Sequence, residues 1–405
     1  MTQPRTKPDA LIVGGGLNGP MTAIALASGG LSVAVIDALP EVTRKSPDFD
    51  GRAYALAHAS VSMLRVLGVW DALSDQAQPI LDIKVSDGRA GEGASPFFAH
   101  FDHTELEEGP MGYMVEDRHL RPALLERMEA LGVAHLADTT VTGWAAGRIG
   151  TSAGPMEAPL IIAADGRRSP LAAMAGIRRQ GWDYEQTSLV CAIAHEKPHN
   201  GTAHQFFTPA GPLAILPLTG NRSSIVWTEK RPRAEAIQAG DDAAYLAALR
   251  PVFGDFLGEL SLAGARFAYP LNLSLATSLT GPRLALVGDA GHGIHPLAGQ
   301  GFNLGVKDAA ALAQVLIEAR RRGEDIGASN VLERYQSWRH FDTMLMAAAT
   351  DGINRLFSND NPILRGVRDL GLGAVGALPG LRRGFMRQAA GLSGERPRLL
   401  QGRPV

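Results

Sequence analysis

Residues 284–308 constrain this chain more than any other stretch. They open with a short apolar run, 284–287, which is typical of a buried strand, and continue as a glycine-rich loop into a helical pattern over 309–316. The glycines let the backbone approach a ligand closely, and Asp289 at the strand end is placed to accept hydrogen bonds from a polyol. The free N–H groups at the start of the helix face the same place with a partial positive charge. This combination predicts a flavin site, with the ribityl hydroxyls on Asp289 and the electron-rich edge of the ring at the helix N-terminus.

A second motif lies near the N-terminus. An apolar run over 9–13 is followed by Gly14, Gly16 and Gly19 in G-x-G-x-x-G spacing, a helical pattern over 21–27, and a second strand pattern over 31–36 that ends in Asp37. Glycines at this spacing allow a tight turn and a close approach to a pyrophosphate, and an acid about 20 residues further on binds a ribose hydroxyl. In this context the motif predicts a bound dinucleotide, without separating FAD from NAD.

A third motif stands between the other two in the sequence. The apolar run 160–164 ends in Asp165 and Gly166, with two arginines and Ser169 after them. Alone, this pattern is more typical of an ordinary turn between a strand and a helix. Its position between two cofactor motifs makes it a candidate for the same site.

Taken together, the motifs resemble those of the single-component flavoprotein aromatic hydroxylases, the p-hydroxybenzoate hydroxylase-like FAD-dependent monooxygenases. Within that group the chain is similar to the polyprenylphenol hydroxylases of ubiquinone biosynthesis. The narrower resemblance rests on 295–308, which fits that subfamily's signature without a gap, and on 50–56 and 211–218. One departure is 18–20, Asn-Gly-Pro, where relatives usually carry small or apolar residues.

The resemblance implies a reaction. NADH or NADPH would reduce FAD, O2 would add to the reduced flavin as a C4a-hydroperoxide, and the ring of a polyprenylated phenol would be hydroxylated. The chain's own residues would then hold FAD, exclude water and orient the ring. Two alternatives stay open, namely a flavin-dependent polyprenyl reductase and a non-catalytic FAD-binding scaffold of the ubiquinone-biosynthesis complex. Oxygen uptake with substrate would separate the three.

The same resemblance assigns roles to particular residues. The catalytic edge beside the flavin ring would consist of Pro296, as a rigid wall, with Gly299, Gln300 and Gly301. The residues expected to bind the cofactor are Gly14, Gly16, Gly19, Asp37, Arg52, Arg118, Asp165, Asp289, Gly301, Phe302 and Asn303.

Three of these assignments are more specific or carry an alternative. Arg52 is expected at the pyrophosphate, and Asp165 is expected to serve both FAD and a transient nicotinamide cofactor. Arg118 is read equally well as a surface charge at the start of a helix. No metal site is expected, because His292 and His295 lie in a glycine-rich loop without a third ligand cluster.

The expected fold is α/β, with a Rossmann-like FAD-binding domain interleaved with an antiparallel-sheet substrate domain. Because the three motifs must meet on one cofactor, the FAD-binding domain is predicted to comprise 1–85, 110–180 and 281–340. The substrate domain is predicted over 86–109 and 181–280, where short strand patterns at 188–194, 204–208, 212–218 and 223–228 are separated by Gly, Pro and Asn. A helical C-terminal region is expected over 341–405.

Composition favours a cytoplasmic enzyme. The net charge of −2 gives no reason to expect nucleic-acid binding, and the single cysteine, Cys191, lies in an apolar run and fits a reducing compartment. The sequence has no apolar run near the ~18 residues that span a bilayer, and the first residues are too polar for a leader peptide.

The C-terminal end has a different charge. From Arg355 onward it carries nine arginines against three acids, interleaved with apolar residues such as Leu370, Leu381 and Phe385. Basic residues beside an apolar stripe suit an anionic membrane surface or a partner helix. We therefore expect peripheral association with the inner membrane face or with other ubiquinone-biosynthesis enzymes. The alternative is a C-terminal helix packed on the flavin domain with solvated arginines.

Overall fold

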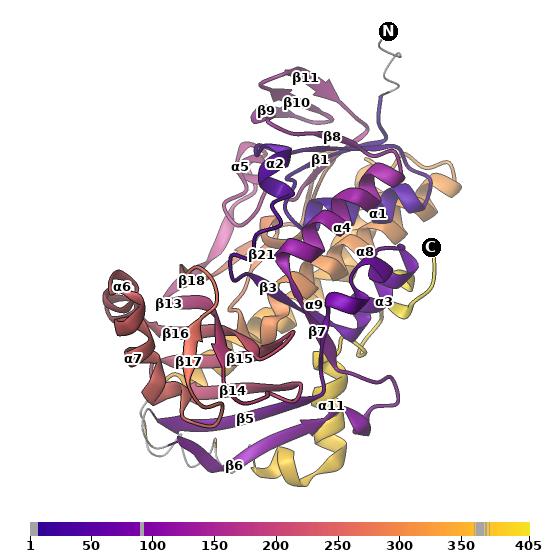
Figure 1. Ribbon diagram of the computed structural model, residues 1–405. Helices are drawn as coiled ribbons and strands as arrows, with labels where there is room; N and C mark the ends of the chain where they lie inside the picture. The colour runs from indigo at the N-terminus through magenta and orange to yellow at the C-terminus, as the bar shows by residue number, and fades with distance from the viewer. Residues whose placement is uncertain (1–6, 90–92, 360, 362–367, 369–370, 372) are drawn as a thin grey trace.

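The computed structural model describes residues 7–89, 93–359, 361, 368, 371 and 373–405. The described chain is a mixed α/β protein built around two large sheets (Figure 1). This confirms the expected fold class, including the helical C-terminal region.

The first large sheet carries the motif strands and has the order β19-β20-β12-β1-β2-β8. Its strands are β1 (Ala10–Val13), β2 (Val33–Ile36), β8 (Ala134–Leu136), β12 (Leu160–Ala163), β19 (Thr280–Gly281) and β20 (Leu284–Leu286). All neighbours are parallel except β19 and β20. Every residue of β1, β2, β12 and β20 is buried, as expected for a parallel sheet covered on both faces.

Alternate residues of β1 face different layers. Ala10 and Ile12 pack in a cluster with α1 (Asn18–Ser28), α4 (Asp117–Ala130) and α8 (Gln300–Arg321). Leu11 and Val13 pack with α5 (Pro170–Met174) and a small antiparallel sheet. That small sheet consists of β9 (Val141–Ala145), β10 (Arg148–Thr151) and β11 (Gly154–Glu157), at the top of Figure 1.

The second large sheet has the order β21-β18-β13-β16-β15-β14-β5-β6, with β17 also paired to β13. Its strands are β5 (Asp82–Arg89), β6 (Gly93–Asp102), β13 (Arg179–His195), β14 (Thr202–Thr208), β15 (Gly211–Leu218), β16 (Arg222–Lys230), β17 (Leu260–Leu262), β18 (Phe267–Ala276) and β21 (His292–Gly293). The four strand patterns expected between 188 and 228 are therefore confirmed. Helices α6 (Arg231–Ala239) and α7 (Asp242–Phe253) cover one face, where Tyr245 packs edge-on against Trp227.

Shorter elements connect the two sheets. Strands β3 (Ala53–Ala57), β4 (Gln78–Ile80) and β7 (Gly112–Glu116) form a three-stranded sheet, flanked by α3 (His58–Val66). The short helix α2 (Glu41–Arg44) follows β2, and the long helix α9 (Ser329–Phe357) follows α8. Four of the predicted domain boundaries, 85/86, 180/181, 280/281 and 340/341, fall inside β5, β13, β19 and α9 respectively. The division into an FAD-binding and a substrate domain otherwise stays a prediction.

The C-terminal helix α11 (Pro379–Ala389) packs beside β5 and β6 rather than on the first sheet (Figure 1). Its Met386 is buried with Leu106 and Met111. Two of its arginines form ion pairs there, Arg382 with Glu105 at 2.9 Å and Arg387 with Glu108 at 3.0 Å. Leu370 lies outside the described residues.

Among the described residues, no helix combines enough length with enough apolar character to cross a bilayer.

Candidate active site

The loop after β20 leads directly into the N-terminus of α8. The helix begins at Gln300, well ahead of the 309–316 pattern, and Gly299 at its N-cap has a φ of 63°. A glycine adopts this left-handed conformation without steric cost and offers no side chain to bond the first N–H groups of the helix. A Cβ added to Gly301 would meet no atom within 4 Å. The helix therefore points its positive dipole end toward open space beside Gly301.

Asp289 lies at the other end of this loop. Its side chain is 42% exposed, and its nearest ionic partner is the Nε of Arg167, 4.0 Å away. Arg179 fixes the backbone here by donating to the carbonyl oxygens of Asp289, at 3.2 Å, and Ala290, at 2.5 Å. The carboxylate is thus held in place by its backbone and remains available to accept hydrogen bonds.

The glycines of the N-terminal motif meet three different requirements. Gly14 has a φ of 114°, and a Cβ there would lie 2.3 Å from the carbonyl oxygen of Ala164. A Cβ on Gly19 would lie 1.8 Å from the carbonyl oxygen of Gly14, so the third glycine permits close packing of α1 on β1. A Cβ on Gly16 would meet nothing within 4 Å. Only the second glycine therefore borders open space, which is where a pyrophosphate approaches in this motif.

Asp37 ends β2 beneath this turn. A Cβ on Gly15 would lie 2.1 Å from its Oδ2, so the carboxylate packs against the glycine loop. Arg44 of α2 donates to both carboxylate oxygens, at 2.7 and 2.8 Å. Burial by itself raises the pKa of Asp37, but the Arg44 hydrogen bonds and charge hold that pKa well below its usual range. The ribose contact of Asp37 stays a prediction, and Arg44, which no motif marked, is the partner that the sequence did not reveal.

Arg52 and Arg118 both lie in ion pairs at the edge of the three-stranded sheet of β3, β4 and β7. Arg52, just before β3, is 2.6 Å from Asp50 and 3.5 Å from Asp117. Arg118, in the first turn of α4, donates from its Nε to Glu116 at 2.7 Å. Their expected contacts with a cofactor remain predictions.

Three contacts bring the sequence motifs together. The turn at Gly14 touches the end of β12 at Ala164. Asn18 of α1 fills the space left by Gly288 and Gly305, since a Cβ on either would lie within 2.4 Å of its amide. Its Oδ1 is buried and has no hydrogen-bond partner among the described residues. With Arg167 of the third motif 4.0 Å from Asp289, these contacts connect all three motifs.

Asp165 is used mainly within its own segment. Its carboxylate accepts hydrogen bonds from the Ser169 hydroxyl at 2.6 Å and from the Leu171 N–H at 3.1 Å, which holds the start of α5. Burial raises the pKa of Asp165 above its usual value. Its double role toward FAD and a nicotinamide stays a prediction.

The remaining predicted residues follow Pro296. Pro296 and Gln300 are half-buried at the start of α8, and the Phe302 ring lies 5.6 Å from that of Tyr54. The Asn303 amide makes four hydrogen bonds. It accepts from Ala57 N and Ser60 Oγ at 2.9 and 2.8 Å, and it donates to the carbonyl oxygens of Ala55 and Gly299 at 2.8 and 3.1 Å. This uses the full capacity of an asparagine amide, so Asn303 fixes the helix start against β3 and leaves only its backbone for a ligand.

A buried network beneath the loop was not apparent from the sequence. The fully buried Asp308 carboxylate accepts from Gly288 N at 2.9 Å, from His292 Nε2 at 2.5 Å and from Arg339 Nε of α9 at 2.7 Å. Burial by itself raises the pKa of Asp308, but its interactions with His292 and Arg339 hold that pKa below the usual value. Asp308 thus ties the first residue of the loop to α8 and α9.

His295 lies apart from this network. Both ring nitrogens are buried without a hydrogen-bond partner among the described residues, and the ring packs edge-on against Tyr184 at 5.3 Å. Burial lowers the pKa of His295 to about 4, so the imidazole is neutral at physiological pH. His292 therefore pairs with Asp308, whereas the His295 ring packs against Tyr184.

Comparison with known proteins decides the family. A family described as "FAD binding domain" matches residues 7–349. The chain is 45% identical to "Ubiquinone hydroxylase UbiL" of Rhodospirillum rubrum, over 98% of this chain and 93% of that protein. The chain belongs to this family of FAD-binding hydroxylases.

One further relative agrees with that assignment, and one solved structure has the same fold. The "3-demethoxyubiquinol 3-hydroxylase" of Escherichia coli is 36% identical over 94% of this chain and 98% of its own length. Among solved structures, the p-nitrophenol 4-monooxygenase PnpA of Pseudomonas putida aligns with a TM-score of 0.80, at 20% identity, over 96% of this chain and 99% of that one. The latter likeness supports the fold of the family.

The geometry fits the FAD of this family. Open space borders Gly16 and Gly301, where an added Cβ would meet nothing. The half-exposed Asp289 carboxylate and the N-terminus of α8 lie at the two ends of one loop. A ribityl chain needs an acceptor and an electron-rich ring edge needs donors, and this loop supplies both.

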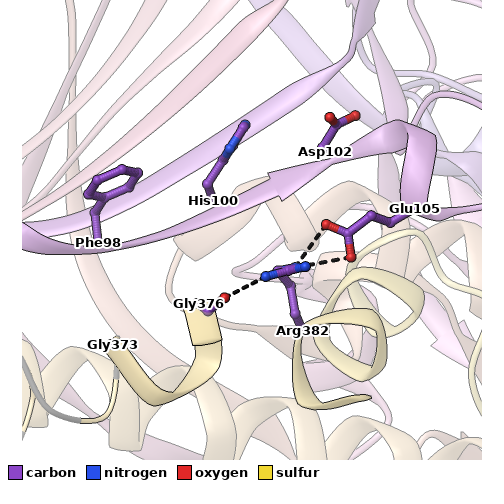
Figure 2. Close-up of a pocket in the computed structure, with 7 residues that line it drawn as sticks. All are labelled: Phe98, His100, Asp102, Glu105, Gly373, Gly376 and Arg382. Atoms are coloured by element: carbon purple, nitrogen blue, oxygen red, sulfur yellow. Dashed lines mark hydrogen bonds and ion pairs between the residues drawn. The ribbon is translucent and has the colours of Figure 1, made fainter. Parts of the chain in front are cut away.

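A polar pocket lies apart from this loop (Figure 2). It has a volume of about 370 Å³ between β6 and the C-terminal segment, and its lining comprises Phe98, His100, Asp102, Glu105, Gly373, Gly376 and Arg382. Arg382 points to Glu105 across it, and His100 Nε2 lies 2.6 Å from Asp82. None of the predicted site residues lines this pocket.

Proposed function

We propose that this hydroxylase acts on the aromatic ring of a polyprenylated phenol in ubiquinone biosynthesis, with NADH or NADPH as reductant and O2 as oxidant. One oxygen atom enters the ring and the other leaves as water, while the nicotinamide supplies the two electrons. The observation that carries the proposal is the convergence of all three motifs on one loop in a chain 45% identical, over nearly its whole length, to a ubiquinone hydroxylase.

The chain's own residues would hold the cofactor in a definite orientation. Asp289 would accept from the ribityl hydroxyls, the N-terminus of α8 at 299–301 would face the electron-rich ring edge, and Gly16 would border the pyrophosphate. A helix N-terminus stabilises nearby negative charge by roughly 0.3–2 kcal/mol. FAD, when bound and reduced, supplies the oxygen chemistry.

The phenol ring would lie where the loop meets the second large sheet. Strand β21 of the loop pairs with β18, since Gly293 is opposite Ser274 and His292 opposite Leu275. Ile294 packs there in an apolar cluster with Leu273. Apolar walls exclude the water that would otherwise compete with the ring.

The nicotinamide would bind only in passing. The sequence contains a single G-x-G-x-x-G unit in a strand–turn–helix context, at 14–19, and this already serves FAD in the proposal. We therefore place the reductant at the outer side of the same site. We also place the protein in the cytoplasm, beside the inner membrane face, because a polyprenylated substrate dissolves in that membrane.

Oxygen uptake tests the proposal. The purified FAD-loaded protein with NADH or NADPH and a short-chain prenylphenol should consume one O2 for each hydroxylated product. Mass spectrometry should show one added oxygen atom that comes from labelled O2. Turnover without O2 consumption would instead identify a reductase, and absence of turnover with every prenylphenol would leave a cofactor-binding scaffold.

A further inference from the structure

One row of side chains on the second large sheet is more accessible than the rows beside it. Its members are Val190, Val226, Ala214, Gln205 and Val85, on β13, β16, β15, β14 and β5, strands that run side by side in Figure 1. Each member is directly opposite the next in the strand pairing, so all five side chains lie on one face of the sheet. All five are half-buried. We call them the central row, which is roughly 19 Å long because neighbouring strands lie about 4.8 Å apart.

The flanking rows on the same face are covered by other elements. They consist of the residues two positions away on each strand, and their buried members are Ala192, Ser224 and Ala203 on one side and Ser188, Thr228, Phe207 and Asp87 on the other. Ala192 and Ala203 pack in one cluster with Met114 of β7. Phe207 packs in a second cluster with Phe357 of α9, with ring centroids 4.1 Å apart. The three apolar residues in the middle strands of the central row belong to neither cluster. The sheet is thus covered on both sides of the central row and left accessible along it.

One end of the central row reaches the catalytic edge. Val85 packs against the second cluster, which contains Leu297, the residue directly after Pro296. Gln205 lies opposite Val85 and is the one polar member of the row. Its Nε2 makes only a long hydrogen bond, 3.4 Å, to the carbonyl oxygen of Leu213. The amide at this end can therefore bond a ligand that lies beside the catalytic edge.

The order of side chains along the row matches an amphiphilic molecule. Gln205 offers a hydrogen-bonding amide at the catalytic end, whereas Ala214, Val226 and Val190 continue from it as an apolar surface. Such side chains gain free energy when an apolar chain removes them from water. No member of the row is charged, so the row does not suit the phosphates of a dinucleotide. A phenol with a prenyl chain has the required sequence of one polar group and one apolar chain.

We propose that the central row binds the substrate, with the ring hydroxyl on Gln205 and the prenyl chain across Ala214, Val226 and Val190. The inference rests on the proposed function, which supplies the class of substrate. The amide oxygen of Gln205 accepts a hydrogen bond from the phenol O–H and so orients the ring at the catalytic edge. Ala214, the smallest member, leaves the space through which the chain passes from the ring to the two valines.

Chain length tests the apolar part of the row. Equilibrium dialysis with the full-length FAD-loaded protein measures Kd for phenol, 2-prenylphenol and 2-geranylphenol. Each added isoprene unit should tighten binding about tenfold or more in the unaltered protein. In Ala214→Phe this gain should disappear, and in Ala214→Leu it should be reduced. The matched control is Ala247→Phe on α7, which adds the same ring at an exposed position and should keep the full gain.

The ring hydroxyl tests Gln205. The unaltered protein should bind 2-geranylphenol about tenfold more tightly than geranylbenzene, which lacks the hydroxyl. Gln205→Leu should lose this preference while it keeps the gain with chain length, and Gln205→Glu, which retains an acceptor oxygen, should keep the preference. During turnover, Gln205→Leu should also form less hydroxylated product for each O2 consumed, with the remaining oxygen recovered as hydrogen peroxide.

The outcomes separate this inference from the proposed function. A full gain with chain length in Ala214→Phe, or no gain in the unaltered protein, overturns the placement of the chain. If circular dichroism and FAD content show that Ala214→Phe does not fold, an unreduced gain in Ala214→Leu has the same meaning. An unchanged hydroxyl preference in Gln205→Leu overturns the role of Gln205. Absence of O2 uptake by the unaltered protein with 2-geranylphenol would refute the proposed function, whereas the dialysis results decide the central row by themselves.

Discussion

Removal of the Asn303 amide gives a measurable test of how the helix start is positioned. Asn303→Ala deletes four hydrogen bonds, of 2.8 to 3.1 Å, that join β3 and α3 to Gly299. A buried group left without a partner costs roughly 1–3 kcal/mol, and neighbouring groups recover part of this loss. We therefore expect unfolding free energy to fall by about 2–5 kcal/mol, with FAD affinity reduced because the N-terminus of α8 is no longer fixed.

Urea unfolding of the apoprotein and fluorescence titration with FAD measure the two effects. Asn303→Asp should be at least as damaging, because a carboxylate oxygen would then face the carbonyl oxygens of Ala55 and Gly299. The control Asn221→Ala removes an exposed amide with one hydrogen bond to Glu196 and should change stability by less than about 0.5 kcal/mol. If Asn303→Ala matches that control in both assays, the positioning role is refuted.

Three further predictions follow from the same site. In Gly16→Val and Gly301→Val the new side chain would point into open space, so the apoprotein should keep its melting temperature while its affinity for FAD, measured by titration, falls. An unchanged FAD affinity would show that FAD does not bind beside these two glycines. Asp289→Ala should lower FAD affinity by ~1–3 kcal/mol, as an acceptor for buried hydroxyls is lost, and full retention of flavin after gel filtration would place the ribityl chain elsewhere. Arg339→Met removes the ion-pair partner of the buried Asp308 carboxylate and should lower the free energy of unfolding by about 3–5 kcal/mol. Arg339 helps to keep the pKa of Asp308 low, so the unaltered protein loses the stability from this carboxylate only when the pH falls through that lowered pKa. Without Arg339 the pKa of Asp308 rises, and the same stability should be lost at a higher pH. Urea midpoints measured across the acidic pH range would show this shift.

The sequence led us to expect the three motifs close together, because each motif is a local signal. Each motif consists of a strand, a glycine turn and a following helix, and the carboxyl ends of parallel strands share one edge of a sheet. The contacts of Gly14 with Ala164 and of Asn18 with Gly288 follow from that rule. Asn18, which departed from the subfamily pattern, occupies a space that two glycines leave open.

Other features had no local signal. Arg44 reaches Asp37 from a four-residue helix, and Arg339 reaches Asp308 from a different helix, 31 positions along the chain. The tertiary packing of the elements decides which acid a long arginine side chain contacts, and the spacing of residues in the sequence does not reveal that packing. The C-terminal arginines show the same limit, since their count suggested a free basic surface whereas Arg382 and Arg387 are paired with acids beside β6.

The interleaved strand order affects how the protein folds during its synthesis on the ribosome. Strand β1 pairs with β12, so Ala10 cannot form its pair until Leu160 has been synthesised. Strand β12 in turn pairs with β20, where Ile161 is opposite Leu284. At ordinary rates of translation, each of these delays is on the order of ten seconds. During that time β1 has β2 on one side but lacks its neighbour on the other side. A nascent chain that stops before β20 therefore cannot complete the parallel sheet. An amino-terminal fragment of that length also lacks the loop after β20, and so it cannot form the proposed FAD site.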